Sequence, residues 1–260
     1  MKEKSERKYK STALDKAFGI LSLLADQTEG LTLSETARAL DTTVGKIYRI
    51  LVSLADSGFI KRDVATEKYQ LTVKLLEISL RHSSTNKLVQ TAQPRLQRLA
   101  AETLHSCHLG VRFSRELLIV AKAESPVSPH FSVNVGAMFP LHETTSGVVL
   151  LADEPPDEIA QYKSNAPDWN IKEFEERRKS LVKNGFASWP SDILPGVLNM
   201  SFPIRDYTNR TIAALTIPYM PTKRVRMSPE MVQAHLGTVA DDISVSLGYM
   251  TPAAEDAVAK

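Results

Sequence analysis

Residues 31–71 read LTLSETARALDTTVGKIYRILVSLADSGFIKRDVATEKYQL, and this stretch decides the fold of the first part of the chain. Thr32 and Glu35 have the spacing of a capping box, which predicts a helix that begins at about Leu33. Turn-forming residues at 41–43 interrupt that helix. Beyond them, apolar side chains recur with the spacing of a helix face packed on a core: Ile47, Ile50, Leu51 and Leu54. The pattern predicts two helices joined by a short turn.

The second of these helices keeps a polar, basic face for the outside. A recognition helix needs such a face, because its N-terminal residues meet base edges while neighbouring cations meet phosphates. Lys46 and Arg49 supply the positive charge. We therefore expect DNA contacts from the outward-pointing residues at the start of this helix: Thr43, Val44, Gly45, Lys46, Tyr48 and Arg49.

The flanking sequence supplies what such a helix pair needs for support. Upstream, residues 12–24 predict a third helix with an apolar face turned inward: Leu14, Phe18, Leu21 and Leu24. Downstream, residues 59–62 and 68–71 predict two short strands around a polar turn. This hairpin predicts a wing, with Arg62 and Lys68 near its tip as further DNA contacts. The first part of the chain is thus expected to be a winged helix-turn-helix.

Charge leaves two alternatives open for this region. Residues 1–82 carry 14 Lys/Arg and 11 Asp/Glu, a net charge of +3, whereas residues 83–260 carry a net charge of −1. Most of the excess lies in residues 1–10, which form either a solvated terminus or an arm that contacts DNA phosphates. The three helices could also be a module that packs against another protein.

Composition places the chain among ordinary globular proteins. It has 260 residues, of which 43% are hydrophobic and 24% charged, enough for two modest domains. The single cysteine, Cys107, excludes an intrachain disulfide, and we expect neither a secretory signal nor a membrane span. The expected compartment is the cytoplasm. The polar run at 83–86 predicts a break, so we place the domains at 1–82 and 83–260.

The second domain combines helical and alternating patterns. Residues 107–113 alternate in hydrophobicity, 116–123 read as a hairpin partner, and 131–135 repeat the alternation. Further strands are expected at 197–204 and 211–219. Helices are expected at 87–104, 144–152, 171–183 and from 228 towards 248. This order predicts an α+β domain with a mainly antiparallel sheet.

The order of several motifs resembles the IclR-type family of bacterial transcriptional regulators. In the first domain the matching motifs are Tyr48-Arg49-Ile50-Leu51, Gly58-Phe59 and Tyr69-Gln70-Leu71. In the second they are Gly136-x-x-x-Pro140-Leu141-His142, Thr144-Thr145-Ser146-Gly147, Pro195-Gly196-Val197 and Ala213-Ala214-Leu215-Thr216. The family often has Ser or Thr where this chain has Gly45. The resemblance implies a GAF-like effector-sensing domain and a homodimer, with pairing of dimers into tetramers left open.

The resemblance also implies a site for a small organic acid, with an aromatic acid as one candidate. Carried over residue by residue, the effector contacts are Thr145, Ser146, Asn199, Thr216 and Pro218. Hydroxyls and the amides at a helix start suit a carboxylate. Small residues, a cysteine and a second serine are frequent in the family at these positions, which leaves the identity of the effector open. A second set either lines an apolar part of the pocket or packs in the core: Met138, Phe186, Trp189, Phe202 and Tyr219.

Motifs for catalysis are absent from the sequence. There is no nucleophile elbow, phosphate loop or dinucleotide fingerprint. Within the cluster at 105–108, Cys107 and His108 should point to opposite faces of a strand, so we expect neither a metal nor another cofactor. His142 beside Glu143 lacks a partnered nucleophile.

We therefore predict a sequence-specific, DNA-binding transcriptional regulator, a repressor or an activator, controlled by a small organic acid and not an enzyme. The alternative is a ligand-binding or enzymatic domain whose helical head is a protein-interaction module. A regulator of the same architecture that has lost its effector is a third possibility.

Overall fold

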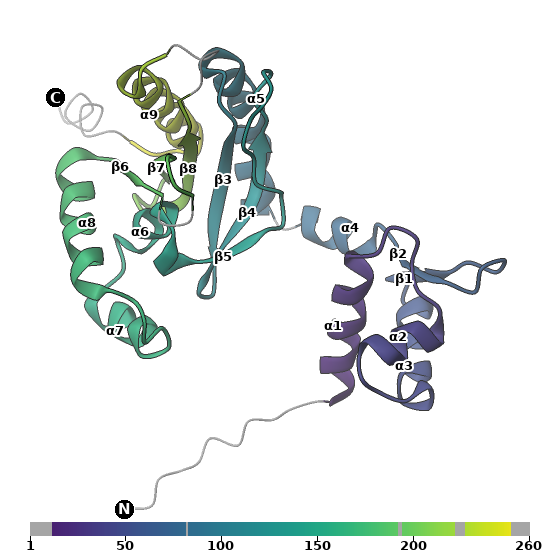
Figure 1. Cartoon of the computed structure of the whole chain (residues 1–260). Coiled ribbons are helices and arrows are strands. Elements are labelled where there is room, and N and C mark those ends of the chain that lie inside the picture. The colour runs from purple at the N-terminus through teal and green to yellow at the C-terminus, as the bar shows by residue number, and fades with distance from the viewer. Residues whose placement is uncertain (1–11, 82, 192–193, 222–226, 251–260) are drawn as a thin grey trace, which may run out of the picture. The chain divides into compact units, whose positions relative to one another are not determined.

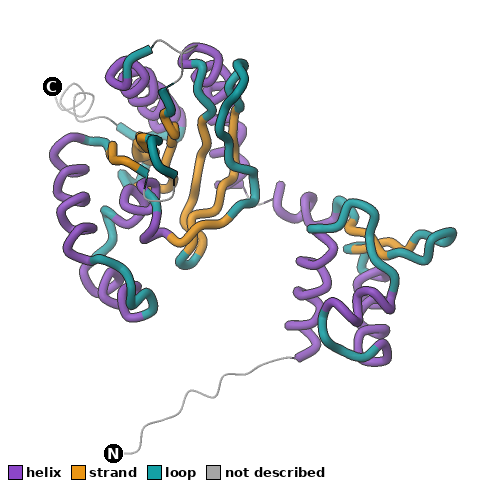
Figure 2. Tube along the Cα trace, in the orientation of Figure 1, coloured by secondary structure: helices purple, strands orange, loops and turns teal. Residues whose placement is uncertain are grey.

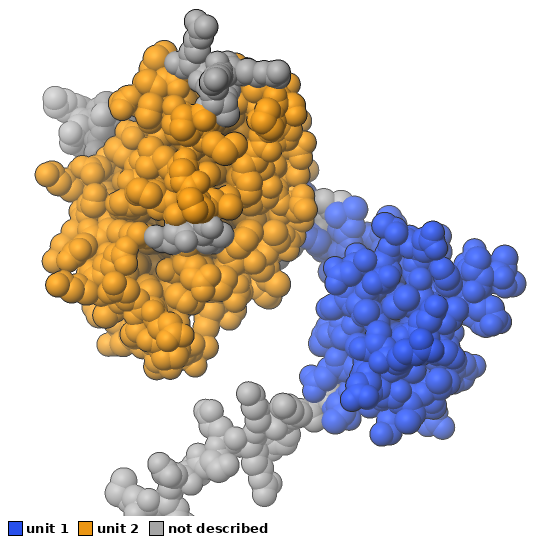
Figure 3. Space-filling view, in the orientation of Figure 1, with its two compact units in different colours: residues 1–86 blue, residues 87–260 orange. Residues whose placement is uncertain are grey.

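The chain folds into two compact units, residues 1–86 and residues 87–260 (Figures 1 and 3). The structure, a computed structural model, describes residues 12–81, 83–191, 194–221 and 227–250. The basic arm at residues 1–10 lies outside the described residues. The division between the units falls after Asn86, whereas the sequence predicts a boundary after residue 82.

Unit 1 is a helical body with a two-stranded hairpin that projects from it (Figure 2). The capping box is present, since Thr32 N donates to Glu35 Oε2 at 2.8 Å and Glu35 N donates to Thr32 Oγ1 at 3.3 Å. The described elements are α1 (Thr12–Ala25), α2 (Leu33–Ala39), α3 (Val44–Asp56), β1 (Ile60–Arg62), β2 (Tyr69–Leu71) and α4 (Lys74–Arg81). The three-helix body and the wing that the sequence predicts are therefore confirmed.

The buried face of α1 matches the predicted one in its second half only. Leu24 is buried and Leu21 packs against the core of unit 1, as predicted, whereas Leu14 and Phe18 are 57% and 63% exposed. Ile20, which was not predicted, is buried as well. Apolar residues occur on more than one side of this helix, so periodicity alone chose the wrong pair for its first two turns. The exposed pair leaves an apolar surface on α1.

The predicted break between the domains is helical. Residues 83–86 form the first turn of α5 (Ser83–Thr103), which continues through Pro94. The prediction treated the polar side chains of this turn as a break. Polar residues are tolerated in an exposed first turn, because its amides lack partners within the helix.

Unit 2 is built on one six-stranded sheet in the order β5-β4-β3-β8-β7-β6, with every neighbouring pair antiparallel. The predicted strand at 131–135 is absent, because β4 pairs at that edge with a later segment, and residues 131–135 run as a loop. The described strands are β3 (Cys107–Phe113), β4 (Glu116–Ala123), β5 (Met138–Pro140), β6 (Ala187–Pro190), β7 (Leu198–Arg205) and β8 (Thr211–Tyr219).

Helices cover the two faces of this sheet. One apolar cluster joins the sheet to α5 and α9 (Pro229–Ser246), which lie together in Figure 1. A second cluster, on the other face, joins the sheet to α6 (Thr145–Leu151), α7 (Pro156–Ser164) and α8 (Ile171–Asn184). On β8, Leu215 and Ile217 face the first cluster, so Thr216 between them faces α6. The face that carries α6 holds the candidate effector site.

Candidate DNA-reading surface and effector cavity

The start of α3 presents its residues to solvent. Ile47 and Leu51 are fully buried against the rest of unit 1, which fixes the orientation of the helix. The opposite face carries the residues predicted to contact DNA, and all of them are exposed: Thr43, Val44, Gly45, Lys46, Tyr48 and Arg49. A Cβ added to Gly45 would meet nothing within 4 Å. The first turns of α3 are thus open to a large partner.

The two predicted cations of the wing are both paired within unit 1. Arg62 Nη2 lies 2.7 Å from Glu67 Oε1 across the hairpin, and Lys68 Nζ lies 3.2 Å from Glu29 Oε2. Hydrogen bonds from the turn to the Asp63 carboxylate, chiefly from Thr66, lower the pKa of that group. Any anionic partner at the wing would therefore have to compete with these carboxylates for Arg62 and Lys68.

A cavity of about 100 Å³ lies in unit 2 between the sheet and α6. It is lined by all the effector contacts implied by the family resemblance, namely Thr145, Ser146, Asn199, Thr216 and Pro218. The remaining lining is His108, Leu117, Phe131, Val133, Phe139, Thr144, Ser191 and Leu194. The family resemblance therefore placed five residues on this cavity, but it did not include the polar residues His108, Thr144 and Ser191 or most of the apolar side.

Three buried hydroxyls form a chain beside the cavity. Thr216 Oγ1 on β8 lies 2.8 Å from Ser146 Oγ on α6 and 2.8 Å from Ser201 Oγ on β7. Each of the three side chains is at most 3% exposed. Hydroxyls rotate to donate or to accept, so this hydroxyl chain (Ser146, Thr216, Ser201) can turn a donor towards a ligand oxygen.

His108 is the titratable side chain of the cavity lining. The sequence considered it only as a metal ligand. Burial in the cavity wall lowers its pKa from 6.5 to about 4, so the imidazole is neutral at pH 7. The register pairs His108 with Thr216 on one side and with Lys122 on the other. Because directly opposed residues share a sheet face, these three side chains form one polar row.

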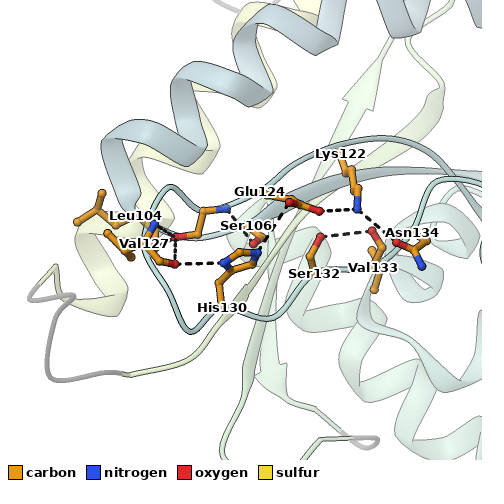
Figure 4. Close-up of polar contacts among 10 residues, drawn as sticks. Leu104, Ser106, Lys122, Glu124, Val127, His130, Ser132, Val133 and Asn134 are labelled. Atoms are coloured by element: carbon orange, nitrogen blue, oxygen red, sulfur yellow. Dashed lines mark hydrogen bonds and ion pairs between the residues drawn. The ribbon is translucent and has the colours of Figure 1, made fainter.

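A loop that follows β4 forms part of the cavity wall. This covering loop, residues 124–137, contributes Phe131 and Val133 to the lining. Near one end, Ser125 Oγ donates to the Leu104 carbonyl at 2.7 Å. Lys122 Nζ lies 2.7 Å from Glu124 Oε1 and 3.3 Å from Asn134 Oδ1, which ties the two ends of the loop to β4 (Figure 4).

The second set of apolar candidates lies outside this cavity. Phe186 and Phe202 stack on each other at 5.2 Å, and Tyr219 stacks on His105 at 4.8 Å. Trp189 packs against the cluster beneath α8, and Met138 is 54% exposed on the edge strand β5. Of the two interpretations that the sequence left open, core packing therefore describes Phe186, Phe202, Tyr219 and Trp189. Met138 fits neither interpretation.

Within the described residues, the side chains considered as metal ligands or as a general base form neither a metal site nor a catalytic arrangement. No His, Cys, Asp or Glu side chains there gather in a group that could hold a metal ion. Cys107 points away from His108, as predicted, and its thiol donates to the Leu96 carbonyl at 3.4 Å. His142 Nδ1 lies 3.4 Å from the Tyr162 hydroxyl, which donates to the Arg115 carbonyl. None of the described helices has the length and apolar character to cross a membrane.

Comparison with known proteins decides the family. The model of the IclR helix-turn-helix domain matches residues 13–64, and that of the bacterial transcriptional regulator IclR C-terminal domain matches residues 81–245. The chain belongs to the IclR family of bacterial transcriptional regulators. An IclR-family chain is a regulator with a helix-turn-helix and an effector-binding domain, so the enzymatic alternative is discarded.

Two curated relatives of this IclR-family regulator cover nearly its whole length. The HTH-type transcriptional regulator KdgR of Escherichia coli (strain K12) is 27% identical over 248 residues, 90% of this chain and 92% of the relative. The glycerol operon regulatory protein of Streptomyces coelicolor is 29% identical over 231 residues, 85% of this chain and 91% of the relative. At 27% and 29% identity, neither relative assigns its own target operon to this chain.

Solved structures agree with the fold of this IclR-family chain. An IclR homologue from Microbacterium hydrocarbonoxydans, complexed with 4-hydroxybenzoate, superposes with a TM-score of 0.77 at 21% identity, covering 91% of this chain and 99% of that one. HmgR of Pseudomonas aeruginosa superposes with a TM-score of 0.74 at 23% identity, covering 92% of this chain and all of that one. The predicted α+β class with an N-terminal winged helix-turn-helix is therefore confirmed.

Proposed function

We propose that this IclR-family regulator reads operator DNA with α3 and the wing and binds a small aromatic acid in the cavity of unit 2. The acid shifts the protein between arrangements that bind the operator with different affinity. The observation that carries the proposal is the cavity lining, because it joins a hydroxyl-rich side to an apolar side at the positions the family resemblance implies.

The chemistry of the lining selects the ligand class. Leu117, Phe131, Val133 and Phe139 offer an apolar surface that suits a flat hydrocarbon body. The hydroxyl chain and the Asn199 amide offer donors for a carboxylate at the other end. The neighbouring fold from Microbacterium hydrocarbonoxydans was solved with 4-hydroxybenzoate, an acid of this class.

The DNA half of the proposal is supported by the exposed basic face of α3. IclR-type regulators bind operators as oligomers, and two copies of unit 1 would read the half-sites of a near-palindromic operator. Apolar side chains that unit 1 leaves exposed would be covered in a homodimer: Leu14 and Phe18 on α1, and Leu75, Leu76 and Ile78 on α4. Such a protein acts in the cytoplasm. Sedimentation velocity distinguishes a dimer from a tetramer formed by two dimers.

Fluorescence anisotropy on the DNA upstream of its own gene, against a scrambled duplex at physiological salt, tests the DNA half. We expect tight binding to the first and weak binding to the second. Arg49→Ala should weaken operator binding and lower the salt slope by about one. Arg210→Ala, an equal charge change on an exposed residue of unit 2, is the control. Normal operator binding by Arg49→Ala would show that α3 is misassigned.

A thermal-shift panel of aromatic and aliphatic monocarboxylic acids tests the effector half. Asn199→Ala should leave operator affinity unchanged and reduce the ligand-induced shift, because its side chain lines the cavity of unit 2 and the proposed DNA contacts all belong to unit 1. A flat response of the wild-type protein to every acid would instead indicate a constitutive DNA-binding protein.

A further inference from the structure

The described lining of the effector cavity offers no fixed positive charge to a carboxylate. Among the described residues that line it, none is Lys, Arg, Asp or Glu, and His108 is the titratable group. The side chains of the hydroxyl chain are neutral. A carboxylate that enters such a site loses water and finds hydrogen-bond donors but no counter-ion.

Within the described residues, the elements packed against His108 bring no available counter-charge to the cavity. From β4, the opposed residue is Lys122, whose ammonium is already bound to Glu124 and Asn134. From β8 the opposed residue is Thr216, and the seven residues of α6 include no titratable side chain. From β7, Asn199 and Ser201 are neutral as well.

The covering loop adds one further imidazole. His130 Nε2 lies 3.9 Å from Glu124 Oε2, and its Nδ1 lies 3.1 Å from the Val127 carbonyl (Figure 4). This histidine does not line the cavity; it faces the ion pair that Glu124 makes with Lys122. His108 is therefore the group best placed to meet a bound carboxylate.

We propose that the cavity binds its acid together with one proton, which His108 holds as an imidazolium paired with the ligand carboxylate. This inference rests on the proposed effector function of the same cavity. The regulator would then respond to the monoanion of a weak acid plus a proton, so its effective affinity depends on pH as well as on acid concentration. A dianion would leave a second charge without a partner and be rejected.

The proton must come from solvent during binding, not from the resting protein. With a pKa of about 4 in the protein alone, His108 is almost entirely neutral at pH 7. A carboxylate within hydrogen-bond distance favours the charged imidazole and raises that pKa. By linkage, the affinity falls about tenfold per unit of rising pH between the pKa of His108 in the free protein and its raised pKa in the complex, and becomes independent of pH above the latter.

Isothermal titration calorimetry of the full-length protein with benzoate, in two buffers of different ionisation enthalpy at pH 7, measures the proton directly. We expect net proton uptake on benzoate binding, approaching one proton per benzoate as the pH is lowered, and a Kd that rises with pH by up to tenfold per unit. Benzyl alcohol, a neutral ligand with the same ring, should bind without proton uptake. Benzoate binding with no proton uptake would overturn the inference while leaving the proposed effector function intact.

Variants assign the proton to a residue. His108→Gln keeps a hydrogen-bonding side chain but cannot be protonated, so we expect Kd at pH 6.5 to rise at least tenfold and to lose its pH dependence. His130→Gln, the matched control on the covering loop, should retain the proton uptake of the wild type. A Lys122→Met variant that loses benzoate binding, with no proton uptake in the wild type, would show that the ammonium leaves Glu124 to pair with the ligand instead. If no acid of the panel binds, the proposed function itself fails.

Discussion

Ser146 Oγ on α6 lies 2.8 Å from Thr216 Oγ1 on β8, and this contact joins the helix to the sheet beside the effector cavity. Thr216 Oγ1 is also 2.8 Å from Ser201 Oγ, so the Thr216 hydroxyl is the hydrogen-bond partner of both serines. All three are buried, and a buried hydroxyl without a partner costs about 1–3 kcal/mol. The Ser146–Thr216 pair therefore both links α6 to the sheet and lines the cavity.

Replacing Thr216 with valine should lower the free energy of unfolding of unit 2 by about 1–3 kcal/mol, because Ser146 and Ser201 each lose their shared partner. The shape is nearly unchanged, so packing contributes little. Denaturant unfolding measures the effect. Thr216→Ser keeps the hydroxyl and should cost less than Thr216→Val. If the serine variant is the less stable of the two, the methyl group rather than the hydroxyl matters here.

A second prediction concerns the glycine that lets α6 approach the turn before it. A Cβ on Gly147 would overlap the backbone carbonyl of Leu141, which cannot move as a flexible side chain would. Gly147→Ala should therefore destabilise unit 2 by about 3 kcal/mol, the upper part of the range for overpacking. Denaturant unfolding of purified protein, or loss of soluble protein on expression, reports the effect.

Gly45→Ala is the matched control for that change. It adds the same methyl group to a helical glycine in open space, so stability should rise by up to about 1 kcal/mol. Its operator affinity is informative in addition. A loss of affinity with a gain of stability would mean that the backbone of α3 at Gly45 approaches DNA closely.

Local patterns predicted the helix-turn-helix because its signals are local. Thr32 and Glu35 of the capping box are three positions apart, and the buried Ile47 and Leu51 are four positions apart. The burial of α1 could not be predicted in the same way. Leu14 and Phe18 are as apolar as Ile20, and only the tertiary arrangement decides which side meets α2 and α3.

The cavity shows even more clearly that local sequence patterns do not reveal tertiary contacts. Its polar contacts followed from motifs, but the contribution of Phe131 depends on where a loop without regular structure crosses the sheet. Alternation correctly placed His108 and Cys107 on opposite faces of β3. It could not show that the face of His108 meets Thr216, 108 positions later in the chain, or that a cavity lies there.

At the wing, neutralising Glu67 should strengthen DNA binding. Glu67→Gln releases Arg62 from its ion pair and removes a negative charge that faces the DNA phosphates in the proposed complex. We expect a few-fold tighter binding to any duplex at low salt and a salt slope steeper by up to about one phosphate contact. Anisotropy titrations at several salt concentrations measure both. Glu102→Gln makes the same charge change on the exposed surface of unit 2 and should have no such effect. If Glu67→Gln leaves the salt slope unchanged, Arg62 does not contact DNA phosphates.

The single cysteine gives a clean measure of opening in unit 2. Burial raises the pKa of the Cys107 thiol to about 12, so only about one molecule in ten thousand carries the thiolate at pH 8. Ellman's reagent should therefore leave the native protein almost unlabelled over minutes and label one thiol per chain in guanidinium. Rapid labelling of the native protein at pH 8 would mean that α5 separates readily from β3.

Stability without ligand should fall in mild acid because of His108. Burial lowers its pKa from 6.5 to about 4 in the folded protein, so between these values the unfolded chain binds the extra proton. The contribution of the neutral imidazole is fully present above pH 6.5 and is lost as the pH falls towards 4. From pH 7.5 to pH 5 the wild type should lose about 2 kcal/mol more than His108→Gln, whose carboxylates titrate alike. Guanidinium unfolding of both proteins at the two pH values measures this difference. Equal losses would mean that the folded protein protonates His108 freely, in which case the empty cavity admits water to the ring. With saturating benzoate, the wild type but not His108→Gln should no longer lose this stability in mild acid, because the ligand and the proton bind the same folded state.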